Sequence, residues 1–201
     1  MKKKHKKQAI KGPSIVVLVC IIVMTMCWIE ACRNYGFAEV AIEMQTSDGS
    51  FSNISQNKLL DIISKDTCVV VFVDGNEDIS KIKKALYINS VNYRIKNIYF
   101  YDVANDKGKV ELDESGKAKV TRQATDFYNK LINILGDFAE VYAVANKYGD
   151  LVNTGYKTIY TPFTIFVKNG EIKYSYYLTS NDVDLIELRD IYSKGFELIE
   201  N

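Results

Sequence analysis

Cysteine and histidine are the residues of this chain best suited to catalysis, and their spacing supports little of it. The four cysteines are Cys20, Cys27, Cys32 and Cys68, and no two of them form a Cys-x-x-Cys pair or a metal-binding spacing. The single histidine, His5, lies in a run of lysines, which excludes histidine-based catalysis and a histidine-rich metal site. No glycine-rich phosphate-binding loop is present. We therefore predict no catalytic residue, no metal site and no cofactor.

Charge is distributed unevenly along the 201 residues. Six of the 26 basic residues lie within residues 1–13, where there is no acidic residue. The rest of the chain carries 20 basic against 25 acidic residues. An acidic body without a basic stripe argues against nucleic-acid binding.

The lysine-rich tail, residues 1–13, precedes an apolar segment, residues 14–30, which we predict to be a transmembrane signal-anchor. Its nearly uncharged part of about 16 residues would span roughly 24 Å as a helix, somewhat less than a hydrocarbon core of ~30 Å. Basic residues before the segment place the N-terminus in the cytoplasm and the remainder of the chain outside it, with the anchor in contact with membrane lipid. Two alternatives are a cleaved signal, which would release a secreted domain, and a lipoprotein signal with a lipid on Cys32.

For the remainder of the chain we predict a linker, residues 31–53, and one α/β domain, residues 54–201. Apolar runs at Cys68–Val73 and Asn97–Val103 indicate buried strands. The segment 106–121 is polar and rich in turn residues, and Val141–Val144 is compatible with a strand or a helical turn. Apolar residues at helical spacing predict four helices: Ile54–Lys65 with Ser52 or Ser55 as its cap, Ile79–Tyr93, Thr125–Leu135 ending at Gly136, and Asn181–Ile199 capped by Ser180 or Asn181.

The stretch Tyr160–Tyr177 carries the strongest local signals. Phe163–Val167 is an apolar strand, Asn169-Gly170 is the dipeptide most typical of a hairpin turn, and the returning strand begins at Glu171. Pro162 directly precedes the first of these strands, where its missing N–H does not interrupt the ladder.

In this order the elements resemble a thioredoxin-like domain with an insertion at about residues 104–158. The similarity covers about residues 54–199. It is nearest to the membrane-anchored thioredoxin-like proteins of Gram-positive bacteria, including bacteriocin transport accessory proteins. It rests on the entry strand, on Tyr128-x-x-Leu131 with Gly136-Asp137, and on Thr161-Pro162 before the strand with its Lys-Asn-Gly turn. The resemblance implies a three-layer sandwich around a central mixed sheet, preceded here by one transmembrane helix, and a cis-proline at Pro162.

The resemblance also implies where redox chemistry would lie. In that family a Cys-x-x-Cys pair follows the first core strand, at a helix N-terminus that lowers the pKa of a thiol. Here that place is taken by Asp74, Gly75, Asn76, Glu77 and Asp78, with no cysteine within two residues of the expected positions. These residues are also suited to capping a helix. Dithiol exchange by the family's mechanism is therefore absent.

One property of the family could survive without thiols. The residue before the cis-proline, here Thr161, offers backbone groups that can pair with an extended peptide. We therefore expect a binding or accessory module whose partner is an extended peptide or a membrane protein, with Asp74–Asp78, Thr161 and Pro162 forming the groove. Two alternatives remain: a thiol-disulfide oxidoreductase that uses a single cysteine, Cys68 or Cys32, and a scaffold subunit of a membrane assembly that binds through the insertion.

Overall fold

The computed structural model describes residues 22–27, 51–75, 77–179 and 183–200. The chain separates into two compact units, residues 1–41 and 42–201. In the first unit residues 22–27 are helical, and the rest of the predicted anchor lies outside the described residues. Within the part of the chain that the structure describes, no helix has the length and apolar character needed to cross a membrane.

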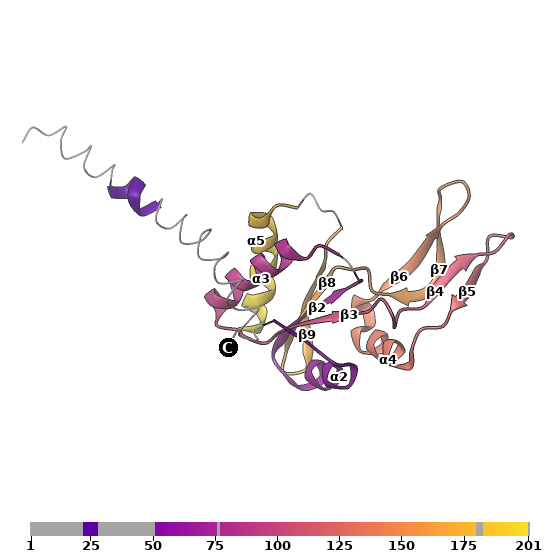
Figure 1. Ribbon diagram of the computed structural model, residues 1–201, viewed down its shortest axis with the longest axis horizontal. Coiled ribbons are helices and arrows are strands. Elements are labelled where there is room, and N and C mark those ends of the chain that lie inside the picture. Colours follow the sequence, from indigo (N-terminus) through magenta and orange to yellow (C-terminus); the bar gives the residue numbers. More distant parts are fainter. Residues whose placement is uncertain (1–21, 28–50, 76, 180–182, 201) are drawn as a thin grey trace, which may run out of the picture. The chain divides into compact units, whose positions relative to one another are not determined.

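The second unit is a mixed α/β structure with a five-stranded central sheet in the order β1-β3-β2-β8-β9 (Figure 1). The strands β1, β3 and β2 run parallel, whereas β8 is antiparallel to β2 and β9 is antiparallel to β8. The five strands are β1 (Phe51–Asn53), β2 (Cys68–Val73), β3 (Ile98–Asp102), β8 (Phe163–Lys168) and β9 (Glu171–Tyr177).

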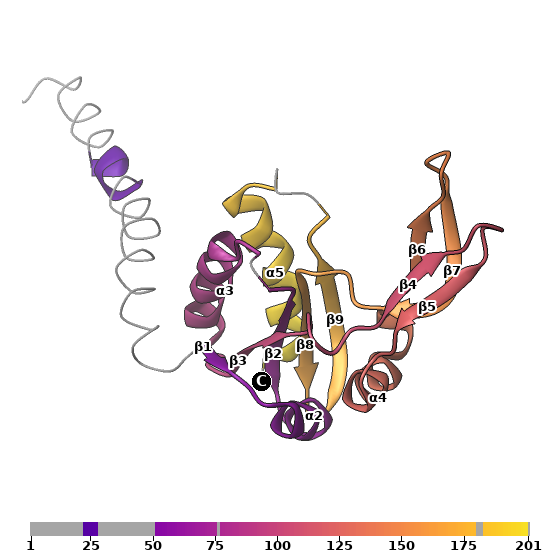
Figure 2. The ribbon, with the colours of Figure 1, turned by 45° about the vertical axis from the view of Figure 1, so that its right-hand side comes forward.

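Helices cover both faces of this sheet, with α2 and α4 on one face and α3 and α5 on the other (Figures 1 and 2). Successive side chains of a strand point to opposite faces, so β2 sends Val70 and Phe72 toward α2 and α4 and sends Val69 and Val71 toward α3 and α5. The prediction that this strand is buried on both faces is confirmed. The helices are α2 (Gln56–Lys65), α3 (Ser80–Tyr93), α4 (Asp126–Leu135) and α5 (Leu185–Ile199).

Two two-stranded sheets flank α4 in the sequence and lie together at one end of this unit in both ribbon views (Figures 1 and 2). The polar segment 106–121 forms most of the first hairpin, although its composition indicated only turns. The ambiguous segment Val141–Val144 belongs to the second. The strands are β4 (Lys109–Leu112) with β5 (Ala118–Arg122), and β6 (Glu140–Ala145) with β7 (Leu151–Thr158).

Helix α4 separates these hairpins but belongs to the core, because Phe127, Tyr128, Leu131 and Leu135 are buried against the sheet. The segment 104–158 is therefore two hairpins on either side of a core helix. The side chain of Thr125 caps this helix by accepting from the backbone N–H of Tyr128 at 3.1 Å.

One strand lies where a linker was expected, and one helix begins later than expected. The last three residues of the predicted linker form the edge strand β1, whose pairing with β3 supplies hydrogen bonds that the linker's composition does not reveal. Helix α5 begins at Leu185, because the side chain of Asp184 caps it by accepting from the N–H of Glu187 at 2.8 Å. The expected caps Ser180 and Asn181 lie outside the described residues.

The Asn169-Gly170 turn is present as predicted, with both residues at positive φ (51° and 80°). Gly170 is needed for a second reason that the sequence does not show. A Cβ at this position would lie 2.3 Å from the carbonyl oxygen of Ser64, at the end of α2. The turn therefore packs directly against that helix.

Candidate functional site

The turn after β2 and the residue before Pro162 are joined by one carboxylate. Glu77 Oε2 accepts from the backbone N–H of Asp74 at 3.0 Å, and Glu77 Oε1 accepts from the hydroxyl of Thr161 at 2.7 Å. The peptide bond between Thr161 and Pro162 is cis, the isomer that the resemblance implies. Residues 84 positions apart in the sequence thus meet where the binding groove was expected.

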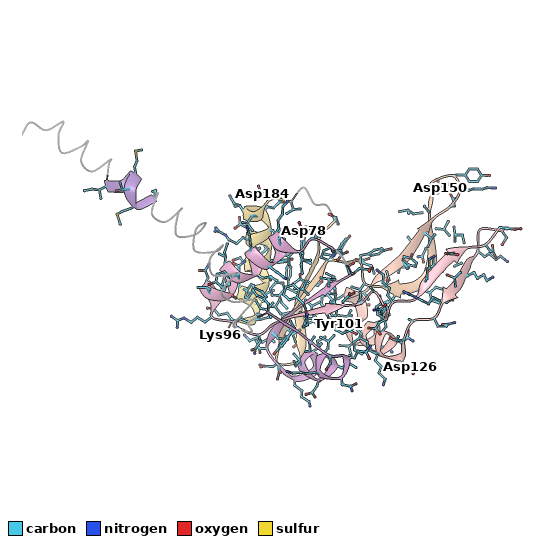
Figure 3. All side chains as sticks on the ribbon, viewed as in Figure 1. Asp78, Lys96, Tyr101, Asp126, Asp150 and Asp184 are labelled. Atoms are coloured by element: carbon cyan, nitrogen blue, oxygen red, sulfur yellow. The ribbon has the colours of Figure 1, made fainter. Side chains whose placement is uncertain are left out.

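The other carboxylates of this turn are also bound internally. Asp78 Oδ1 accepts from the N–H of Ser80 at 3.0 Å, and the hydrogen bonds from the backbone and side chain of Ser80 lower the pKa of Asp78. Asp74 forms an ion pair of 2.8 Å with Lys107. Gly75, at φ 61°, donates its N–H to Asp102 at 3.1 Å. Figure 3 places Asp78 at the beginning of α3.

These contacts favour a structural role for the acidic turn. Its carboxylates are held by backbone donors, the Thr161 hydroxyl and a lysine, so they fix the loops around the start of α3. The N-cap residue of α3 is Ile79, which supplies no side-chain cap, so the expected capping role of these residues is not seen. Asn76, the remaining residue of the expected site, lies outside the described residues. The contact of Glu77 with Thr161 bridges the space between the two segments.

The backbone polar groups of Thr161 differ from these carboxylates in their hydrogen bonding. Among the residues that the structure describes, none forms a hydrogen bond with its N–H or C=O group. The neighbouring Pro162 carbonyl, in contrast, accepts from the N–H of Leu178 at 3.0 Å. A half-buried residue with an unpaired donor and acceptor is suited to pairing with an added strand.

A buried carboxylate behind this turn was not indicated by the sequence. Asp106 is 5% exposed and accepts from Gln56 Nε2 at 2.8 Å, from the Thr125 hydroxyl at 2.9 Å and from the Tyr101 hydroxyl. Burial, together with this contact to Asp106, raises the pKa of Tyr101, which Figure 3 shows in the interior of the unit. The cluster links α2, β3 and α4 and positions Lys107 beside Asp74. Asp106 lies in a polar, non-periodic segment, so no sequence signal marked it.

Cys68 lies in the core with no solvent exposure. Burial, with a smaller effect of the nearby Asp66 carboxylate, raises the pKa of its thiol to about 12. A thiol with such a pKa carries almost no thiolate at neutral pH, and it is the thiolate that attacks disulfides. Of the other cysteines, Cys27 is exposed, whereas Cys20 and Cys32 lie outside the described residues.

Within the described ranges, no group of three or more histidine, cysteine, aspartate and glutamate side chains is arranged to hold a metal ion. No protein-family model matches the chain, and comparisons with curated proteins and with solved structures found no match either.

Proposed function

We propose that residues 54–201, together with the edge strand β1, form a thioredoxin-like domain. The support is the strand order β1-β3-β2-β8-β9, with its parallel first half and antiparallel second half. Further support comes from the helices, since α2 and α4 cover one face of the sheet and α3 and α5 cover the other. The two hairpins around α4 are additions to this arrangement.

The domain is a binding or accessory module that carries no redox dithiol. The observation that carries this function is the backbone N–H and C=O of Thr161 beside Pro162, which have no hydrogen-bond partner in the part of the chain that the structure describes. An extended segment of a partner adds to the domain by hydrogen bonding to these two groups. Glu77 acts as a positioning residue, because its contacts with Asp74 and Thr161 hold the turn and the proline loop together.

The test measures hydrogen exchange of individual backbone amides in the full chain in detergent micelles. The probe is reduced, carboxymethylated lactalbumin, an unfolded polypeptide. The Thr161 amide should exchange rapidly in the free protein and at least tenfold more slowly at saturating probe. The Leu178 amide, already bonded to the Pro162 carbonyl, is the matched control and should not change. Bound probe without added protection at Thr161 would refute strand addition at this place.

The single-cysteine oxidoreductase is the alternative that the same protein preparation can test. We expect no reduction of insulin disulfides and slow labelling of native Cys68 by a thiol reagent, since its sulfur is buried and its pKa is raised. Rapid labelling, with turnover that Cys68→Ser abolishes, would establish a redox enzyme instead.

A scaffold subunit is the second candidate function, and the second hairpin favours it. Exposed apolar side chains lie along that hairpin and at its tip, which Asp150 marks in Figure 3. Protection from exchange within residues 140–158 in native membranes, without protection at Thr161, would support this candidate. The exposed residues are Val141 (41%), Tyr148 (77%), Leu151 (75%) and Tyr156 (48%).

We also propose that residues 14–30 anchor the chain in a bacterial cell membrane, with the domain on the extracytoplasmic side. The support is the lysine-rich tail before an apolar segment. In intact spheroplasts, protease added outside should digest residues 51–200 and leave an epitope at the N-terminus protected. The reverse pattern would overturn this orientation, and recovery of the domain in the medium would indicate a cleaved signal.

A further inference from the structure

A cavity of about 190 Å³ lies where both hairpins meet α4. Its apolar lining comes from β4, β5 and α4, and tyrosines contribute from α4, β6 and β7. It shares no lining residue with the acidic turn or with Thr161. Its main lining residues are Val110, Val120, Ile132, Tyr128, Tyr142 and Tyr156, with the charged side chains Arg122 and Lys157.

The charge of this cavity is opposite to that of the chain around it. Two of its lining residues are cationic and none is acidic. Outside its lysine-rich tail, however, the chain has an excess of acidic residues. Two cations lining one cavity without a carboxylate indicate a site whose complement is an anion.

Arg122 is fixed in place without being neutralised. Its Nη2 atom donates to the carbonyl oxygens of Ala104 at 3.0 Å and Lys107 at 2.6 Å. No carboxylate pairs with this guanidinium among the described residues, so its other N–H groups and its charge remain available. Lys157 is less free, because its ammonium donates to the Gly136 carbonyl at 2.5 Å and lies 3.6 Å from Asp137.

The tyrosines and aliphatic side chains of the cavity favour a ligand that also carries an apolar group. Val110 is 6% exposed, and Val120 and Ile132 are half-buried. The Tyr142 and Tyr156 hydroxyls form no hydrogen bond with another described residue, so they can donate to an acceptor that enters. The cavity is smaller than the ~300 Å³ typical of the smallest drug-sized sites, which suits a group about as large as one side chain.

We propose that this cavity binds a carboxylate that carries one apolar or aromatic group. The carboxylate lies against the Arg122 guanidinium and accepts from its Nε or Nη1 hydrogens, because both Nη2 hydrogens are donated to the Ala104 and Lys107 carbonyls. The apolar group lies among the tyrosines and Val120. A small free acid and the C-terminal residue of a peptide both present this chemistry.

The experiment is ligand-observed NMR with saturation transfer on the full chain in detergent micelles. The probes are 3-phenylpropionate and its amide, and the peptide Gly-Gly-Gly-Phe with a free or amidated C-terminus. We expect the carboxylate forms to bind at least tenfold more tightly than their amides. If only 3-phenylpropionate binds, the source is a small acid; if the free-carboxylate peptide binds at least as well, the source is a chain terminus.

Three variants locate the binding. Arg122→Gln should weaken it at least tenfold, whereas Lys119→Gln, the same charge change three positions before it on β5, should leave it unchanged. Ile132→Trp fills the cavity from α4 without altering charge and should abolish binding. This variant keeps the test valid if Arg122→Gln loosens the loop that holds Ala104 and Lys107.

Several results would overturn the proposal. Equal binding of acid and amide would remove the role of Arg122, and equal effects of Arg122→Gln and Lys119→Gln would place the site elsewhere. Displacement of 3-phenylpropionate by an equal concentration of inorganic phosphate would indicate a plain anion site without an apolar requirement. No binding of any probe at millimolar concentration would contradict the inference altogether.

Discussion

The central sheet and the inserted hairpins contain similar residues but bury very different shares of them. Every residue of β2 and β8 except the last is buried. In β6 none is buried, and in β7 only two of eight are buried. Valine and tyrosine thus stabilise the fold in the central sheet and remain accessible in the hairpins. The difference indicates that the hairpins are the part of this unit whose apolar side chains are accessible for binding.

The two polar sites differ in the same way. In the acidic turn, Asp74, Glu77 and Asp78 are held by internal donors, so their charges maintain the loops. In the hairpin cavity, Arg122 is held by two neutral carbonyls and has no carboxylate partner among the described residues, so its charge stays available. A charged group whose position is fixed by neutral partners is prepared for a ligand of opposite charge.

The largest expected effect contrasts one apolar side chain from each region. Phe166 has no solvent exposure and packs against Tyr192 and Phe196, so Phe166→Ala should lower the free energy of unfolding by about 3–5 kcal/mol. Leu151→Ala, at a residue that is 75% exposed, should cost less than about 0.5 kcal/mol. Urea denaturation measures both. Similar losses of unfolding free energy for the two variants would contradict the difference in burial between the two regions.

The second-largest loss of stability is expected from a substitution of Asp106, which lies between the sheet and the hairpins. Asp106→Asn replaces an acceptor of three hydrogen bonds by an amide whose NH₂ faces donors, so unfolding should become easier by about 2–3 kcal/mol. Asp113→Asn, in the exposed turn of the first hairpin, is the control with the same change of side chain. Equal stability of the two variants would mean that the buried cluster contributes nothing.

A smaller effect is expected at Gly195, in the buried face of α5. A Cβ there would lie 2.5 Å from the Phe166 ring, a clash that costs about 1–3 kcal/mol. The higher helix propensity of alanine offsets roughly 1 kcal/mol of that cost. Gly195→Ala should therefore lower stability, and the loss should shrink when Phe166→Leu is added. A gain in stability from Gly195→Ala alone would show that the ring can move away.

The smallest effect concerns pH and the acidic turn. Since the pKa of Asp78 is lowered in the folded protein, its contribution to stability is present above the unfolded-state pKa and is lost as pH falls through the folded-state pKa. Carboxyl ¹³C NMR should show this carboxyl titrating below the ordinary aspartate value. Ser80→Ala should reduce the shift without removing it, because the backbone N–H of residue 80 is the larger cause. Titration of Asp78 at the ordinary value would contradict its hydrogen bonding to Ser80.

The hydrophobic pattern was sufficient to predict the central framework. Long apolar runs and helical spacing predicted β2, β3, β8 and all four helices that cover the sheet. Asn169-Gly170 predicted its own hairpin, because both residues tolerate positive φ at little cost. These features depend on local propensity and on burial of whole faces, which are encoded in short stretches of sequence.

The candidate site could be predicted only in part. The sequence indicated that Asp74–Asp78 and Thr161 would approach each other, through a resemblance, but not that Glu77 bridges them. The polar hairpin β4–β5 and the buried Asp106 had no signal, since hydrogen bonds between distant residues outweigh the turn-like composition of their segment.

The sequence by itself determined the central framework of the domain, the absence of a Cys-x-x-Cys pair and the uneven charge, because each is a property of residue types in order. Only the tertiary structure decided which polar groups are satisfied. It left the backbone of Thr161 without a hydrogen-bond partner among the described residues, and it brought Arg122 beside three tyrosines from different elements. Hydrogen bonding and desolvation depend on distances between residues far apart in the chain, and folding alone sets those distances.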